Sequence, residues 1–264
     1  MTTVDTLSEP VRILEPVGPF GRRRRVRYPA TRCGFCAHPA VQTTVLGAGP
    51  AYRVYSVAQR HEARRQAEET DAVAHPAFML HTDLRPYWST VYREFPEYQI
   101  VLRDNVTDNH LAHGNMVPLH LGGADEELPG TAVEMVEQAL RDKRDGRPPT
   151  VLGALQAVVH PKYQGRGMSA ETLRAMAGVA GQHGFWSLFA PIRPSRKAQT
   201  PLTPFDQYVE TLRSDGLPMD PWQRVHVRLG ATPAGIAERW LTVRATVGEW
   251  SWWTGTPSPG RWCR

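Results

Sequence analysis

Residues 158–169 read Val-Val-His-Pro-Lys-Tyr-Gln-Gly-Arg-Gly-Met-Ser and decide the fold of this 264-residue chain. The apolar run Val151–Val159 comes before the glycine turn, and a helical pattern, Ala170–Gln182, follows it. A strand, a tight turn and a helix in this order leave free backbone N–H groups at the helix N-terminus, which attract phosphate. Gly165 and Gly167 let the backbone approach a ligand without a Cβ clash. The stretch therefore predicts a loop that binds a pyrophosphate.

Two other phosphate loops are excluded by the residues after the glycines. No Gly-Lys-Ser/Thr follows, as the Walker loop requires. Gly-x-Gly-x-x-Gly is not completed after Gly167, so the dinucleotide fingerprint is absent. The loop resembles instead the Gln/Arg-x-x-Gly-x-Gly/Ala loop of the GNAT superfamily of N-acyltransferases, which holds the pyrophosphate of coenzyme A. The matching residues are Gln164, Gly165, Arg166, Gly167 and Met168, with Ser169 at the last position, where glycine or alanine is usual.

The composition predicts a cytoplasmic, reduced protein. The chain is long enough for one sizeable domain or two small ones, and 41% of its residues are hydrophobic. No run of about 18 apolar residues occurs, so we expect no membrane span. No apolar segment follows the basic residues near the N-terminus, as a secretory signal would require. Three cysteines do not make a disulfide framework.

The net charge of +5 favours acidic partners, such as nucleotide phosphates, carrier proteins or RNA. Much of the excess lies in Arg22–Arg25 and Arg27, within a segment rich in proline and glycine. Such a run is typical of a solvated arm, with docking to a partner as the alternative. We therefore divide the chain into a proline-rich basic arm, residues 1–50, and an acyltransferase domain with a tryptophan-rich tail, residues 51–264.

A zinc site is suggested by Cys33, Cys36 and His38, which lie close together in the arm. A structural zinc ion takes four protein ligands, and this cluster offers three. Cys263 would have to supply the fourth from the other end of the chain. We therefore predict thiols without a metal, and no metal in the function.

Hydrophobic periodicity predicts alternating strands and helices along the rest of the chain. The predicted strands are Tyr52–Val57, Tyr98–Arg103, His110–His120, Val151–Val159, Phe185–Ile192, and a final hairpin of Trp222–Leu229 with Trp240–Val247. The predicted helices are Glu62–Ala74, a helix capped by Thr131 that runs to Asp145, Ala170–Gln182, and Phe205–Arg213 with Thr203 as its cap. This order resembles the GNAT domain over about residues 51–255, most strongly over 152–230. It implies an α/β (α+β) fold with a mixed, splayed sheet flanked by helices.

The resemblance implies how the acyl donor binds. In GNAT enzymes the long strand and the next one splay apart, and the pantetheine of the donor inserts between them as an additional strand, as in β-augmentation. The slot would lie here between Ala154–Val159 and Ser187–Ile192. The N–H of Ala157 or Val158 would stabilise the thioester oxyanion, and Val159 would adjoin the loop. The acceptor amine attacks the thioester directly, without a covalent enzyme intermediate.

The acid and base are harder to assign. Many relatives carry a carboxylate on the long strand, but residues 153–156 contain no acid. His120 and His226 are candidate bases because histidine titrates near neutral pH, although either can be structural. The resemblance makes Tyr208, on the short helix after the second splayed strand, the candidate acid for the leaving thiolate.

Charged residues beyond the second splayed strand are candidate contacts for phosphate or acceptor. They are Arg193, Arg196 and Lys197, for which a solvated loop is the alternative. Asp206 is suited to bind a cationic acceptor or to occupy a favourable first-turn position.

The resemblance predicts an N-acyltransferase that acts on the amine of a small molecule, in the biosynthesis of a specialised metabolite. Its donor is an acyl-CoA or an acyl group on an acidic carrier protein. An aminoacyl-tRNA is a third donor, and a non-catalytic acyl-CoA-binding module is the alternative from another class. An RNA-binding protein is disfavoured because the chain lacks basic strands studded with aromatic residues.

Overall fold

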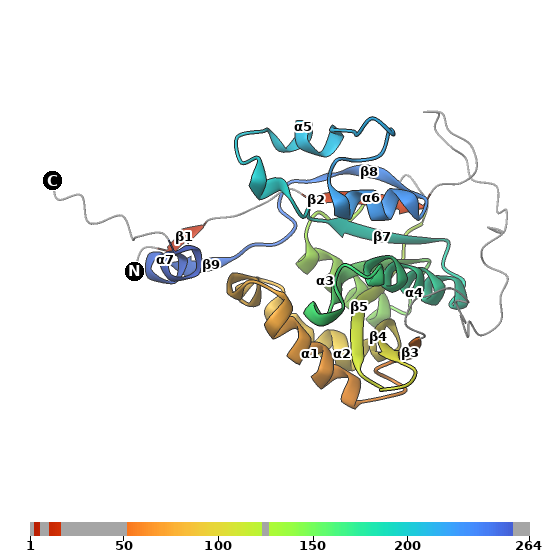
Figure 1. The fold of residues 1–264 in the computed structure, drawn as a ribbon. Helices are drawn as coiled ribbons and strands as arrows, with labels where there is room; N and C mark the ends of the chain where they lie inside the picture. The colour runs from red at the N-terminus through yellow and green to blue at the C-terminus, as the bar shows by residue number, and fades with distance from the viewer. Residues whose placement is uncertain (1–2, 6–10, 17–51, 123–126, 256–264) are drawn as a thin grey trace.

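A computed structural model describes residues 3–5, 11–16, 52–122 and 127–255 (Figure 1). The strands are β1 Thr3–Asp5, β2 Val11–Pro16, β3 Tyr52–Ser56, β4 Gln99–Asp104, β5 His110–Leu119, β6 Val151–Val159, β7 Ser187–Ile192, β8 Ala231–Ala237 and β9 Arg244–Thr246. The α-helices are α1 Glu62–Ala74, α2 Trp88–Glu94, α3 Ala132–Arg144, α4 Met168–Gln182, α5 Phe205–Glu210, α6 Pro221–Arg228 and α7 Val247–Thr254. A short 3-10 helix, η1, spans Ala77–His81.

A mixed seven-stranded sheet with the order β3-β4-β5-β6-β7-β2-β8 forms the centre of the fold. Its strands pair antiparallel except β6 and β7, which are parallel. Adjacent residues of β5 show that helices cover both faces, since successive side chains of a strand point to opposite sides. A Cβ on Gly114 would lie 2.7 Å from Met176 of α4, whereas His113 bonds Asp71 of α1. The predicted α/β fold with a helix-flanked sheet is confirmed.

Elements with strong local signals agree with the sequence. The helix α1 and the long strand β6 have the predicted bounds, Glu62–Ala74 and Val151–Val159. Thr131 caps α3, since its side chain accepts the N–H of Glu134 at 3.0 Å. The Glu134 carboxylate accepts the N–H of Gly130 in return. The threonine cap predicted for α5 is wrong, because Pro204 occupies that position.

The predicted strand Trp222–Leu229 is wrong, because these residues belong to the helix α6. Its alternating pattern suits a strand, but the preceding Asp220 and Pro221 are stronger signals. The Asp220 carboxylate accepts the N–H groups of Trp222 and Gln223 at 2.9 and 3.2 Å, and proline is favoured at the first helical position. The helix buries Gln223 and His226, three residues apart, on one face.

The rest of the predicted final hairpin is also wrong. The strand β8 pairs with β2, and the short β9 pairs with β1 in a separate two-stranded sheet. The beginning of the tryptophan-rich tail belongs to α7. Thr246 and Glu249 start this helix with a reciprocal capping box. In Figure 1, α7 lies beside β1 and β9, away from the main sheet.

The predicted arm contributes a strand to the main sheet. Arg12 of β2 lies opposite Ile192 of β7 on one side and opposite Ile236 of β8 on the other. The arginine run Arg22–Arg27 and the cluster Cys33, Cys36, His38 and Cys263 lie outside the described residues, so the arm and its boundary stay predictions. Over the described ranges, no helix is long and apolar enough to cross a membrane, and no group of acidic, histidine or cysteine side chains is arranged to hold a metal.

Candidate functional site

The main sheet opens between β6 and β7. The two strands pair only at their beginnings, where Val151, Leu152 and Gly153 lie opposite residues 187–189. Beyond these pairs, residues 154–159 of β6 pair with β5 alone, and the end of β7 pairs with β2. One edge of each strand is therefore left for an extended ligand, which can complete the hydrogen bonding as an added strand. The predicted splay is present.

A bulge bends β6 at the start of this open half. Asn115 of β5 lies opposite Gln156, and Met116 lies opposite Ala154, so Leu155 is an extra residue on β6. A bulge of this kind bends the strand and redirects the residues beside it. Ala157 follows directly in the open half, which is compatible with the predicted oxyanion contact from its N–H. That contact stays a prediction.

The loop at the end of β6 presents free N–H groups. Gly165 and Gly167 have φ values of 74° and 80°, and Gly167 is the N-cap of α4. Within the part of the chain that the structure describes, the N–H groups of residues 165–169 donate to no protein acceptor. The Gln164 amide donates to the carbonyl of Val159 at 3.2 Å and fixes the loop to the end of β6. The loop, together with the dipole of α4, is thus suited to a phosphate group, and the predicted phosphate contacts of residues 164–169 stay a prediction.

A polar cluster lies on the α1 side of the open half of β6. Nε2 of His113 lies 3.1 Å from Oδ1 of Asp71, and Nε2 of Gln156 donates to Oδ2 of the same carboxylate at 3.1 Å. His75, one turn along α1, places its Nε2 3.4 Å from Oδ1. Burial disfavours the charged carboxylate, but the bonds from His113 and His75 outweigh it and hold the pKa of Asp71 well below its ordinary value.

The cluster continues along β5. Nε2 of His110 lies 3.3 Å from Nδ1 of His113, and burial, with His113 nearby, lowers the pKa of His110 to about 3. Asn115 donates to Tyr92 and Gln99, which closes the network on the other side. These residues were not predicted from the sequence because they come from separate elements. The available signal was polar side chains at alternate positions of the otherwise apolar strand β5.

The two predicted bases, His120 and His226, contact backbone carbonyls outside this cluster. His120 follows Leu119, which pairs with Val151 at the closed end of the sheet, and its Nδ1 lies 2.7 Å from the carbonyl of Pro148. At about 3.3 Å per residue, it is roughly 20 Å along β6 from Ala157, and its role as a base stays a prediction. His226 lies on α6, not on a strand, with Nδ1 3.0 Å from the carbonyl of Trp222.

The candidate acid Tyr208 is buried in α5, and its hydroxyl donates to Asp220 at 3.0 Å. Burial and the neighbouring carboxylate raise the pKa of Tyr208 to about 12. Asp220 also accepts the N–H of Arg196 at 2.9 Å. This bonding favours a structural role for the tyrosine, and its role as an acid stays a prediction.

The charged residues after β7 either contact other residues of the protein or are exposed to solvent. Arg193 contacts the sulfur of Met79 at 3.5 Å, and Lys197 donates to the carbonyl of Thr200 at 3.1 Å. The Arg196 and Asp206 side chains are exposed. Their proposed contacts with phosphate or acceptor stay predictions.

The buried His226 makes stability depend on pH. Burial lowers its pKa from 6.5 to about 4, so between these values the unfolded chain binds a proton that the folded chain does not. We expect its contribution to be intact above pH 6.5 and to be lost as the pH falls to 4, by about 3 kcal/mol. Urea unfolding at several pH values should show a weaker dependence in His226→Gln than in the wild type. The exposed His61→Gln is the control, and an unchanged dependence in His226→Gln would contradict the expectation.

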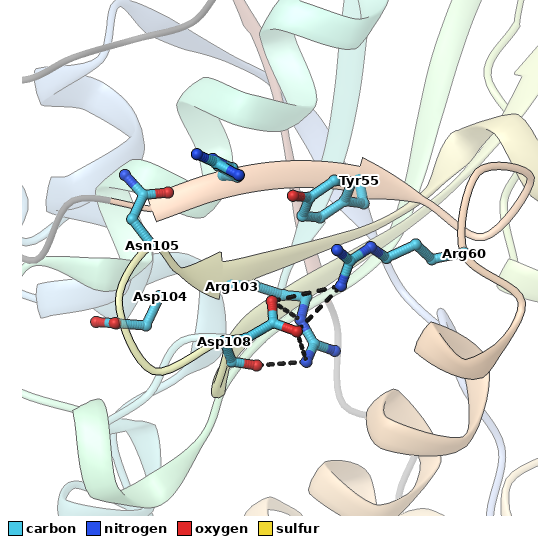
Figure 2. Close-up of a pocket in the computed structure, with 7 residues that line it drawn as sticks. Tyr55, Arg60, Arg103, Asp104, Asn105 and Asp108 are labelled. Carbon is cyan, nitrogen blue, oxygen red and sulfur yellow. Dashed lines mark hydrogen bonds and ion pairs between the residues drawn. The ribbon is translucent and has the colours of Figure 1, made fainter.

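A separate pocket lies at the β3 edge of the sheet. It is lined by Arg53, Tyr55, Arg60, Arg103 and the β4–β5 turn, including Asp108. Figure 2 shows that the Asp108 carboxylate bonds both Arg60 and Arg103, at 3.1 and 2.8 Å. These two guanidinium groups are thus already paired, and the pocket lies beside β3, far from the open half of β6.

Comparisons with known proteins identify relatives and similar folds. No family model matches the chain. It is 29% identical over 234 residues to the arginine N-acetyltransferase avaD of Aspergillus versicolor, which covers 81% of this chain and 80% of that protein. The loading GNATL domain of CurA from Lyngbya majuscula gives a TM-score of 0.58 at 15% identity, over 73% of this chain and 95% of that domain. The GphF GNAT-like decarboxylase in complex with isobutyryl-CoA gives 0.54 at 16% identity, over 73% and 96%.

Proposed function

Because this chain is an N-acyltransferase of the GNAT superfamily, we propose that it moves an acyl group from a coenzyme A thioester to the amine of a small molecule. The observation that carries the proposal is the opening of the sheet after Gly153, which leads directly to the uncapped N-terminus of α4. An extended pantetheine matches the open strand edges, and a pyrophosphate matches the free N–H groups.

The free loop favours coenzyme A over a carrier protein as the donor. A carrier supplies the pantetheine and one phosphate but no nucleotide, and would leave part of the loop unused. GphF, which shares the fold, was solved with isobutyryl-CoA. Carrier protein and aminoacyl-tRNA remain alternative donors, to be separated by experiment.

The relative named an arginine N-acetyltransferase makes arginine the first acceptor to test, with acetyl-CoA as the donor. We place the reaction in the biosynthesis of a specialised metabolite. In the transfer, the amine attacks the thioester carbon, and the N–H of Ala157 or Val158 stabilises the resulting oxyanion. The thiolate then leaves as the C–S bond breaks.

The experiment combines binding with turnover. We expect coenzyme A at 100 times its Kd to stabilise the folded protein by about 2.7 kcal/mol, seen as a higher Tm. Acetyl-CoA with arginine should release free thiol and form N-acetylarginine. Stabilisation only by a phosphopantetheinylated carrier protein would replace coenzyme A as the donor. Stabilisation by coenzyme A without product from a panel of amines would support a binding module instead, and no stabilisation by either would refute the acyl-donor site.

A further inference from the structure

The long strand lacks an acid, but a carboxylate reaches it from another element. Gln156 stands in the open half of β6, directly before Ala157. Its amide donates to Asp71 of α1 at 3.1 Å. The negative charge absent from β6 is therefore supplied beside it by α1.

Two histidines contact the same oxygen of Asp71, but only one is open to a substrate. The side chain of His113 is 1% exposed, within the layer between β5 and α1. The side chain of His75 is 23% exposed, at the C-terminal cap of α1. A small-molecule amine can therefore meet His75, whereas His113 can act only through Asp71.

The segment that follows His75 borders the other wall of the slot. It leads after Pro76 into η1, whose Met79 lies 3.5 Å from the guanidinium of Arg193. Arg193 directly follows β7, the strand that diverges from β6. The Asp71–His75 pair is thus connected to β6 through Gln156 and to the end of β7 through Met79.

We propose that His75 is the base that takes the proton of the acceptor ammonium, and that Asp71 is its positioning residue. The proposal rests on the acyl transfer proposed above. Nε2 of His75 faces Oδ1 of Asp71 at 3.4 Å, which leaves Nδ1 as the ring nitrogen that would accept the proton. His113 and Gln156 hold the carboxylate in place from the opposite side.

With His75 as the base, each proton that the amine loses has an acceptor. The ammonium R–NH₃⁺ gives one proton to Nδ1 of His75, and R–NH₂ then forms the C–N bond. The amine nitrogen loses a second proton as the C–S bond breaks, and this proton ends on the thiolate. The imidazolium later returns its proton to solvent. Its charge is stabilised by Asp71 and by the C-terminus of α1.

The titratable and charged groups around this pair lie on each neighbouring element. They are His113 and His110 on β5 and Tyr92 on α2. Arg103 on β4 and His160 after β6 also help to lower the pKa of His110. None of these side chains bonds His75. Among the groups of the polar cluster, Asp71 is therefore the charged side chain that contacts His75.

The test compares His75→Gln with His61→Gln, a histidine at the other end of α1. With acetyl-CoA and the accepted amine, we expect His75→Gln to lower kcat/KM by about 10²-fold and to remove the limb of the pH profile that rises with pH. His61→Gln should keep the wild-type profile. The Tm increase from coenzyme A should be the same in all three proteins, which shows that the variants are folded and bind the donor.

Asp71→Asn gives the second measurement. Removing the anion should lower kcat and change the rising limb of the pH profile, while the Tm increase from coenzyme A stays the same. A His75→Gln protein with the wild-type profile would overturn the role of His75. A wild type that releases no thiol with any amine would instead refute the proposed function, and with it the role of the base.

Discussion

Replacing Gly167 by glutamate is expected to abolish binding of coenzyme A. Gly167 caps α4 with φ of 80°, a conformation that costs a residue with a side chain about 1–3 kcal/mol. The new carboxylate would also stand where the free N–H groups meet the pyrophosphate, and each lost hydrogen bond to a charged group costs about 1.5–3 kcal/mol. Together these effects predict a Kd at least about 10²-fold higher. Calorimetric titration with coenzyme A measures it.

The matched control is Gly178→Glu, on the same helix. A Cβ at Gly178 meets no atom within 4 Å, and its φ is helical, so the same change in charge is introduced without strain. At 1.5 Å per residue it lies about 16 Å from the loop. We expect Gly178→Glu to bind coenzyme A as the wild type does. Equal loss in both variants would indicate a general effect of charge and contradict the loop as the phosphate site.

Removing residues 1–16 is expected to destabilise the fold more than any single core substitution. The strand β2 pairs with β7 through Arg12, Ile13 and Leu14 and with β8 along its whole length. Its loss leaves β7 attached to the sheet only through its short pairing with β6 and exposes two strand edges. At about 1 kcal/mol for each of several ladder bonds, the loss is on the order of 5 kcal/mol, comparable to the total stability of many domains.

Urea unfolding and size-exclusion chromatography measure this loss. A shorter truncation, residues 1–5, removes only β1 and its separate two-stranded sheet, and we expect it to retain the cooperative transition. A synthetic peptide of residues 9–18 added to the longer truncation should restore part of the stability by strand addition. Full stability without residues 1–16 would show that β2 contributes nothing to the sheet.

Local signals account for what the sequence predicted well. A cap, a helix and a long apolar strand each depend on neighbours along the chain, so Thr131, α1 and β6 were recognised. The residues of α6 were predicted as a strand because the alternating valines satisfy a strand pattern. Asp220 and Pro221, which are typical of a helix start, are the signals that contradict that pattern. The place of β2 was not predictable from local pattern, since its partners lie at Ala190–Ile192 and in β8.

The loop of the proposed donor site was predictable because it, too, depends on neighbours along the chain. Residues 164–169 form one continuous stretch, so the spacing of its glycines before a helix is visible in the sequence. The cluster around Asp71 was not, because Asp71, His113 and Gln156 come from three elements that meet only after the sheet has formed. The sequence shows that β6 carries no acid, but it does not show which other element places a carboxylate beside that strand.

The position of β2 between β7 and β8 has a consequence for synthesis. Val11 pairs with Ala237, so β2 must wait until β8, more than 200 residues later in the chain, has been synthesised before its ladder can close. At a synthesis rate of about 5–20 residues per second, this wait lasts on the order of ten seconds or more. The half of the protein that carries β3 to β6 can assemble during that time, since these strands pair with sequence neighbours. Donor-binding competence should thus not be acquired before β8 has been synthesised.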